Sequence, residues 1–161
     1  MNEEFVFDEM TENDLDNVLD IEKSSFKSPW SRDLFLRELK LDFSFCLVIK
    51  KIVERKKRVV AYIVFWIIAD ELYLLDLAVH RCFRGMGLAG RLVERSIRAA
   101  RSGGCVRALL EVRKDNFIAI KIYKSFDFKV TGSRTAYYSD GEDALLMSRN
   151  INQLTRVSND G

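Results

Sequence analysis

One stretch, residues 72–101, constrains the fold more than any other part of the sequence. Its letters, LYLLDLAVHRCFRGMGLAGRLVERSIRAAR, pass from an almost unbroken apolar run through a glycine-rich basic loop into an amphipathic pattern. The run from Leu72 to Val79 predicts a strand covered on both faces, and Asp76 is the only charge inside it. Beyond Gly87 the apolar residues recur near helical spacing with charged residues between them, which predicts a helix to about residue 101. The order is therefore strand, loop, helix.

Three glycines in the loop, Gly85, Gly87 and Gly90, predict an anion site. They allow a sharp turn and a close approach of backbone N–H groups to a ligand, where the new helix presents its unpaired donors and its positive dipole end. Such a loop binds phosphate. A plain strand-to-helix turn without a ligand is the alternative that the glycines alone leave open.

Two other phosphate-binding motifs compete for the same glycines. They spell G-x-G-x-x-G, the dinucleotide fingerprint, and Glu111 follows roughly 20 residues later, as that motif requires. Against a Rossmann-type NAD-binding protein, residues 80–84 separate the first glycine from the strand, and about half of the chain precedes the motif. A P-loop is weaker still, because Arg91 and Leu92 stand where Lys and Ser or Thr are needed.

Composition describes one ordinary domain. The chain has 161 residues, of which 48% are hydrophobic, and we expect a folded domain over residues 1–150 followed by a disordered tail over residues 151–161. Its three cysteines lack metal-ligand spacing and are odd in number, which favours a reducing compartment. The acidic start has no signal-peptide pattern, and no apolar run reaches about 18 residues, so we expect a soluble, cytoplasmic protein and no membrane partner.

Charge and histidine content narrow the function classes further. A formal net charge of +2 gives no support to a general nucleic-acid binder, and we expect a monomer without direct nucleic-acid binding. The basic segment 50–58 is expected to be an exposed hairpin connection, with docking on ribosomal RNA or an acidic partner as the alternative. A single histidine and scattered cysteines predict no metal site.

The remaining patterns predict an α/β fold, with a mixed central sheet and helices on both faces. Thr11 or Asn13 can cap the first helix, and Ser31 can cap the second after the break at Pro29. Asp140-Gly141 predicts a tight turn between the last two strands. We expect strands near residues 5–6, 43–49, 59–68, 72–79, 108–112, 128–138 and 144–148, and helices near 15–21, 32–39, 88–101 and 116–125.

Chemistry is expected at the C-terminal ends of the parallel strands, near Val79 and Val112. Glu111 is a lone carboxylate in an apolar strand beside this cleft, where burial would make it a stronger proton acceptor and a candidate general base. An ion pair with Arg113 or Arg107 explains the same residue equally well. Both interpretations stay open from the sequence.

Tyr123 and Trp30 can each have either a structural or a functional role. Asn116, Ala119 and Tyr123 form one stripe of a helix, so Tyr123 either faces the cleft or belongs to the core. Trp30 lies at a helix–helix corner and is either core or the wall of a substrate groove. Cys82 is a weak candidate nucleophile, because its only nearby base is His80.

Several motifs together resemble one family. Arg84-Gly-Met-Gly-Leu-Ala89 matches Q/R-x-x-G-x-G/A, the acetyl-coenzyme A loop of the GNAT acetyltransferases. The segments that resemble its RimI branch, the ribosomal-protein alanine N-acetyltransferases, are Phe26-x-x-Pro-Trp-Ser31, Leu110-Glu-Val-Arg113, Asn116-x-x-Ala119-x-x-x-Tyr123 and Tyr137-Tyr-x-Asp-Gly-Glu-Asp-Ala144-x-x-Met147. Two positions depart from the pattern: His80-Arg-Cys82 replaces D-P-x, and Asp127 replaces a glycine, which Asp tolerates because it visits left-handed geometry.

The resemblance implies a single-domain GNAT fold that uses acetyl-coenzyme A as co-substrate and no metal. It assigns Glu111 as the base and Tyr123 as the acid, and it places the acceptor between Trp30 and the pair Tyr137 and Tyr138. The cofactor-binding residues that it implies are Leu77, Ala78, Val79, Arg84, Gly85, Met86, Gly87, Leu88, Ala89, Gly90 and Asn116. The implied partner is a protein N-terminus of a ribosomal protein, acetylated by direct attack of its amine on the thioester. A non-catalytic coenzyme A-binding regulator is the alternative from another functional class.

Overall fold

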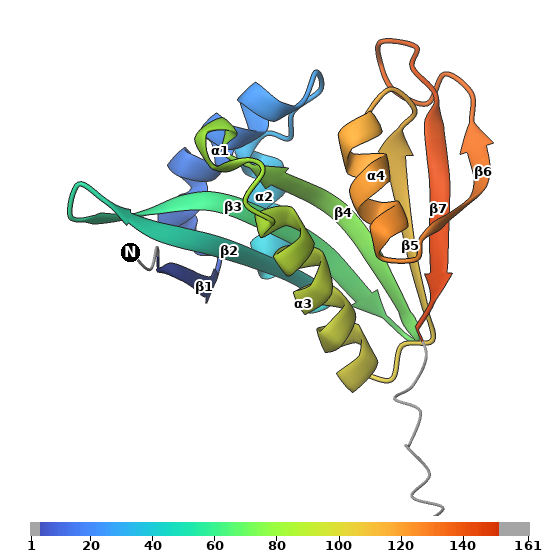
Figure 1. Cartoon of the computed structure of the whole chain (residues 1–161), viewed down its shortest axis with the longest axis horizontal. Helices are drawn as coiled ribbons and strands as arrows, with labels where there is room; N and C mark the ends of the chain where they lie inside the picture. Colours follow the sequence, from blue (N-terminus) through green and yellow to red (C-terminus); the bar gives the residue numbers. More distant parts are fainter. Residues whose placement is uncertain (1–3, 152–161) are drawn as a thin grey trace, which may run out of the picture.

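A seven-stranded mixed sheet organises the protein, as described by a computed structural model that covers residues 4–151 (Figure 1). The strand order is β1-β2-β3-β4-β5-β7-β6, and β4 with β5 is the one parallel pair among these strands. The strands are β1 (Phe5–Glu9), β2 (Ser44–Val53), β3 (Lys56–Ile68), β4 (Glu71–Val79), β5 (Arg107–Arg113), β6 (Lys129–Arg134) and β7 (Ala144–Asn150). The α-helices are α1 (Leu15–Ser25), α2 (Arg32–Lys40), α3 (Leu88–Ser102) and α4 (Phe117–Ser125).

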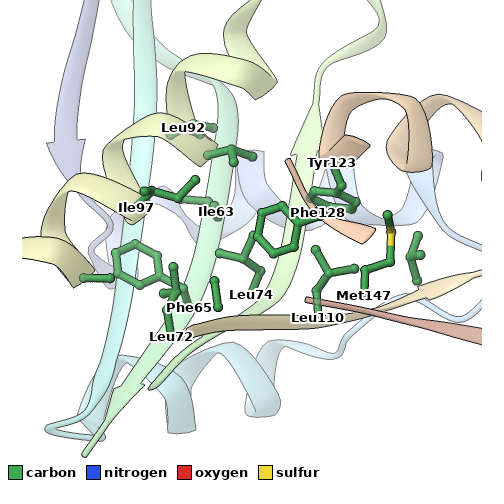
Figure 2. Packing of buried hydrophobic residues seen from close by; sticks show 14 of the residues in the cluster. Ile63, Phe65, Leu72, Leu74, Leu92, Ile97, Leu110, Tyr123, Phe128 and Met147 are labelled. Carbon is green, nitrogen blue, oxygen red and sulfur yellow. The ribbon is translucent and has the colours of Figure 1, made fainter. Parts of the chain in front are cut away.

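The helices cover both faces of the sheet, which confirms the predicted fold class (Figure 1). Helices α3 and α4 enclose one core, in which Ile63, Leu72 and Leu92 are fully buried against ring and aliphatic neighbours such as Phe128 (Figure 2). Helices α1 and α2 enclose a second core on the opposite face. Truncating a fully buried Leu of this kind typically costs about 2–5 kcal/mol, so both faces contribute to stability.

Local signals set the start of α2 and the end of α4 as the sequence predicts. Helix α1 differs, because Thr11 precedes a 3-10 turn over Glu12–Asp14 and α1 itself follows Asp14. Ser31 caps α2, since its hydroxyl oxygen accepts a hydrogen bond from the N–H of Leu34 at 3.2 Å. Helix α4 ends at Ser125; Asp127, two residues further on, takes a left-handed φ of +67°, and the N–H of Phe128 then donates to the carbonyl of Tyr123 at 3.1 Å. The expected tolerance of Asp at the family's glycine position is confirmed.

The fold opens at the middle of β4. Asp76 lies opposite Val64 and Leu74 opposite Phe65, so Leu75 is an extra residue in this ladder. Pairing between β4 and β5 ends at Leu74 with Leu110, although β4 continues to Val79 and β5 to Arg113. The two strands start side by side and then separate (Figure 1). The predicted cleft at the C-terminal ends of the parallel strands is present.

The basic hairpin differs from its prediction as an exposed connection over residues 50–58. Strand β2 continues to Val53 and β3 begins at Lys56, so only Glu54 and Arg55 form the turn, with φ of +51° and +67°. Both positive values match the turn whose twist suits a two-residue hairpin. Charged residues are compatible with strand here because this end of the ribbon is largely solvated.

The last strands also differ from the predicted boundaries. Strand β6 ends at Arg134, not at Tyr138, because Ala136 adopts a φ of +50° and its N–H donates to the Asp143 carboxylate at 2.8 Å. Tyr137 and Tyr138 therefore lie in the loop between β6 and β7. At the C-terminus, Ile151 is buried and its N–H donates to Val106 O at 2.8 Å. The rest of the predicted tail, residues 152–161, lies outside the described residues, and none of the helices within residues 4–151 is long and apolar enough to cross a membrane.

Candidate active site

A cavity of about 130 Å³ lies where β4 and β5 separate. Its walls come from both strands, from α1 and the segment after it, from α4 and from the loop before β7. Six of the predicted site residues line it: Trp30, Leu77, Glu111, Asn116, Tyr123 and Tyr138. The topology thus brings together residues from both halves of the chain. The glycine loop, Ala78, Val79 and Tyr137 are not part of this lining.

The glycine loop leads from the end of β4 into α3. Gly85 and Gly87 both have a φ of +79°, the left-handed conformation that favours glycine, and Gly87 is the residue that precedes the first turn of α3. No acidic residue occupies that first turn. Arg84 ties the loop to the strand, since its Nε donates to the carbonyl of Val79 at 3.1 Å. The loop presents unpaired backbone donors at the positive end of a helix.

The surface of the loop is open above its backbone. A Cβ added at Gly85 or Gly87 would meet nothing within 4 Å, and Met86 is exposed, whereas the Leu88 side chain is buried. Gly90 has another role, because a Cβ there would lie 3.4 Å from the ring of Phe126. The left-handed turns that glycine permits are therefore found at the first two glycines, while the third makes room for helix packing.

The unusual His80-Arg-Cys82 segment has a local explanation. The Nδ1 atom of His80 accepts a hydrogen bond from the backbone N–H of Cys82 at 3.1 Å and caps the short 3-10 helix Arg81–Phe83. A histidine can thus supply the side-chain acceptor at the start of this turn. The same bond directs this nitrogen of His80 to the backbone and not to the thiol, which argues against Cys82 as a nucleophile.

Tyr123 satisfies both interpretations drawn from the sequence. Its side chain is buried, with 8% exposed, and packs against Phe128 at a centroid distance of 5.9 Å (Figure 2). Tyr123 also lines the cavity with Asn116 and Ala119. Burial raises the pKa of the Tyr123 phenol, and the nearby charge of Asp76 raises it further. The hydroxyl is therefore held in its protonated form at neutral pH.

Glu111 lies at the open mouth of the cavity. Its side chain is 34% exposed and pairs with Arg134 of β6 at 3.5 Å, so the expected burial is wrong, as are the expected partners. Arg113 instead contacts Asp115 and Asp140, at 3.2 and 2.5 Å. The sequence missed this pairing because β6 reaches β5 only through β7.

The tyrosine pair forms the rim beside Glu111. Tyr137 and Tyr138 meet edge to face with centroids 5.1 Å apart, and Tyr138 lines the cavity. A hydrogen bond to Glu111 raises the pKa of the Tyr137 phenol, and burial raises the pKa of Tyr138 to about 12. Guanidinium groups lie over both rings: Arg113 is 4.8 Å from the centroid of Tyr138, and Arg134 is 5.5 Å from that of Tyr137.

Two buried acids in the lining of the cavity, Glu22 and Asp76, were missed as site residues. Glu22 is 1% exposed; its carboxylate accepts from the N–H of Trp30 at 3.0 Å and from the hydroxyl of Tyr62. Asp76 accepts from the N–H of Leu77 at 2.9 Å through one oxygen only. Two signals were available: Asp76 interrupts an apolar strand, and Glu22 continues the apolar face of α1 at helical spacing.

Comparison with known proteins agrees with this geometry. The sequence model of the Acetyltransferase (GNAT) family matches residues 15–128, and the chain belongs to this family. An Escherichia coli [ribosomal protein bS18]-alanine N-acetyltransferase is 30% identical over 141 residues, 84% of this chain and 90% of its own. A Bacillus subtilis protein whose name assigns the same reaction provisionally is 36% identical over 142 residues, 87% and 91% of the two chains.

Solved structures give the same result. The crystal structure of the ribosomal-protein-S18-alanine N-acetyltransferase from Escherichia coli superposes with a TM-score of 0.80 at 27% identity and covers 92% of this chain and 95% of its own. Ard1 from Thermoplasma volcanium gives a TM-score of 0.82 at 28% identity, with 92% and 98% covered. The predicted GNAT fold and the resemblance to the alanine N-acetyltransferases are confirmed, and the Rossmann-type alternative is wrong.

The second oxygen of the Asp76 carboxyl group, which accepts no hydrogen bond within residues 4–151, predicts a pH-dependent effect on stability. We expect Asp76→Asn to raise the melting temperature at pH 7 by about 2–10 °C, since an unsatisfied buried group costs about 1–3 kcal/mol. Burial raises the pKa of Asp76, so the folded state retains a proton that the unfolded state releases above pH ~3.9, and wild-type stability falls as pH rises through this window.

The gain should therefore shrink as the pH is lowered toward 3.5, because both forms of the protein then carry a neutral side chain at this position. Thermal unfolding followed by fluorescence across pH 3.5–7 measures it. Glu38→Gln is the matched control: Glu38 is also buried but accepts from Ser44 and Trp66, so its loss should not stabilise the protein. An Asp76→Asn variant less stable than wild type at pH 7 would contradict the prediction.

Proposed function

We propose that the protein transfers an acetyl group from acetyl-coenzyme A to the N-terminal α-amine of a protein, most directly an N-terminal alanine of a ribosomal protein. One observation carries the proposal: the separation of β4 from β5 leaves an anion-binding loop at one side and a tyrosine-lined cavity at the other. The relatives named for bS18-alanine acetylation support the substrate class. A cavity of about 130 Å³ suits a chain end and not a folded surface.

The co-substrate would be held by backbone groups. When bound, acetyl-coenzyme A supplies an activated acetyl group as a thioester. The N–H groups around Gly85 and Gly87 would bind its pyrophosphate at the start of α3. The edge of β4 near Val79, unpaired by β5, would offer backbone groups to its arm, while the N–H of Leu77 already donates to Asp76. A donor of that edge near Val79 would also hold the oxyanion that develops on the carbonyl.

Glu111 and Tyr123 would handle the protons. An α-amine has a pKa near 8, so much of it is protonated at neutral pH, and Glu111 at the mouth would take the proton directly or through a water. The neutral nitrogen then bonds to the thioester carbon, the C–S bond breaks, and Tyr123 gives its proton to the departing thiolate. The position of Tyr123 in the cavity lining supports this role, and its phenol carries a proton at working pH as tyrosines ordinarily do.

The regulator alternative is weaker in this geometry. A protein that only binds coenzyme A needs the glycine loop but has no use for an acid and a base on opposite sides of one cavity. Glu111 and Tyr123 both line this cavity, and both are positioned by elements that begin beyond the loop. The enzyme is therefore the function that the arrangement favours.

The acceptor class can be tested by mass spectrometry of peptides incubated with acetyl-coenzyme A. A peptide that starts with alanine and contains an internal lysine should gain one acetyl group on its α-amine, because a lysine with a pKa near 10.4 is harder to deprotonate than an α-amine by about two units. The same peptide with a formylated N-terminus is the control and should stay unmodified. Labelling confined to lysine would overturn the proposal.

The phosphate site can be tested with two matched glycines at opposite ends of α3. Gly87→Ala and Gly104→Ala replace residues of nearly equal φ, +79° and +81°, with open space above each. Each should cost about 1–2 kcal/mol of stability through left-handed strain. Only Gly87→Ala should weaken coenzyme A binding, by about tenfold or more, because its Cβ would enter the open space through which a phosphate approaches the backbone, and one charge-assisted hydrogen bond lost in this way contributes about 1.5–3 kcal/mol. If calorimetry gives the two variants the same affinity for coenzyme A, the phosphates do not bind at this loop.

The proton roles can be separated by pH profiles of kcat. Glu111→Gln cannot accept a proton, so its rate should recover as pH rises past 8 and the amine ionises in solution. Tyr123→Phe lacks the donor, so its defect should persist across the same range. Each change should lower turnover by about 10²- to 10⁴-fold. Glu94→Gln, an exposed acid on α3, is the control; parallel profiles for the two site variants would mean that the roles are assigned wrongly.

A further inference from the structure

The buried acids of the protein differ in how well they are paired. Asp14 contacts the ammonium of Lys50 at 3.1 Å, and Glu38 and Glu22 each accept hydrogen bonds from two donors. Asp76 is 9% exposed, and within residues 4–151 its buried Oδ2 atom accepts no hydrogen bond from an N–H or hydroxyl donor; the group beside it is the carboxyl of Glu22. A buried carboxylate oxygen without a partner is costly, so its retention points to a ligand.

Asp76 belongs to the wall of the cavity. Asp76 lies just beyond the bulge at Leu75, where β4 has left β5, and it lines the cavity together with Glu22. Tyr123 lines the same cavity, and the hydroxyl of Tyr62 donates to the Glu22 carboxylate. Three of the lining residues are acidic, and the only basic one, Arg113, is already paired with Asp115 and Asp140. The cavity therefore favours a cation.

We propose that Asp76, held beside Glu22, forms a subsite for a primary ammonium group and selects acceptors that enter as cations. The inference rests on the proposed function and names the form in which the acceptor binds. An ammonium has three donors, and Oδ2 of Asp76 together with the remaining lone pairs of Glu22 supplies acceptors for them. The subsite binds and orients the amine and breaks no bond; Glu111 at the mouth then receives the proton.

The structure explains why Asp76, and not Glu22, is the adjustable member of this subsite. Glu22 is fixed by the N–H of Trp30 and the hydroxyl of Tyr62, so it buttresses the floor in the presence or absence of a ligand. The buried charge of Asp76 is costly in the absence of a cation, and a bound cation offsets this cost. The free energy of the buried carboxylate thereby contributes to cation binding. An acceptor of the same shape without a charge would leave this cost in place.

A double-mutant cycle between protein and peptide tests the subsite. Binding to the full chain with coenzyme A present is measured by calorimetry for a peptide that starts with alanine and for the same peptide that starts with propanoyl, which keeps the shape and lacks the amine. Wild type should bind the amine peptide about 10- to 100-fold more tightly, as expected for a buried charged hydrogen bond. Asp76→Asn, which keeps size and shape, should reduce this ratio to less than about threefold, with coenzyme A affinity unchanged.

Glu38→Gln is the matched control for Asp76→Asn. Glu38→Gln removes a buried carboxylate outside the cavity and should keep the wild-type ratio. A full ratio in Asp76→Asn, or an equal collapse in Glu38→Gln, would overturn the subsite. If the wild type acetylates the alanine peptide while Asp76→Asn keeps the ratio, only this inference fails; if the wild type acetylates no α-amine, the proposed function fails instead.

Discussion

The ladder between β4 and β5 governs the rest of the molecule, because it ends before the strands do. Four residue pairs join the two strands, from Glu71 with Arg107 to Leu74 with Leu110. The extra residue at Leu75 then turns β4 away, as bulges near functional sites commonly do. An unbroken ladder would satisfy the edge of β4 and bring the strands to their usual spacing, which would leave no room for a cavity between them.

The cavity that results has two ends with different electrostatics. At the mouth, Glu111 is partly exposed to solvent and contacts Arg134 and Tyr137. Its negative charge is therefore accessible and partly compensated. At the floor, Asp76 and Glu22 lie in a low-dielectric setting, where an unpaired charge is costly and a matching cation is strongly preferred. Burial and the nearby charge of Asp76 raise the pKa of the Tyr123 phenol, which keeps its proton. Binding and proton handling are thereby assigned to separate groups.

Where this chain departs from the pattern of its family, local chemistry replaces the missing residue. His80 supplies a ring nitrogen that accepts the N–H of Cys82, so the turn into the glycine loop remains capped. Asp127 adopts the left-handed conformation that ends α4 before the buried Phe128. Both substitutions preserve backbone geometry, which explains why the glycine loop and α4 keep the arrangement that the family resemblance predicts.

The sequence by itself determined the features that depend on neighbours along the chain. Ser31 and Asn116 cap their helices, and Gly85 and Gly87 take left-handed turns, because each outcome is set within a few residues. Only the tertiary structure decided the environment of the carboxylates. The exposure of Glu111 and its pairing with Arg134 depend on how β6 and β7 join the sheet. The meeting of Asp76 with Glu22 requires α1 to pack on β4, since burial and the Coulomb field depend on distance in space.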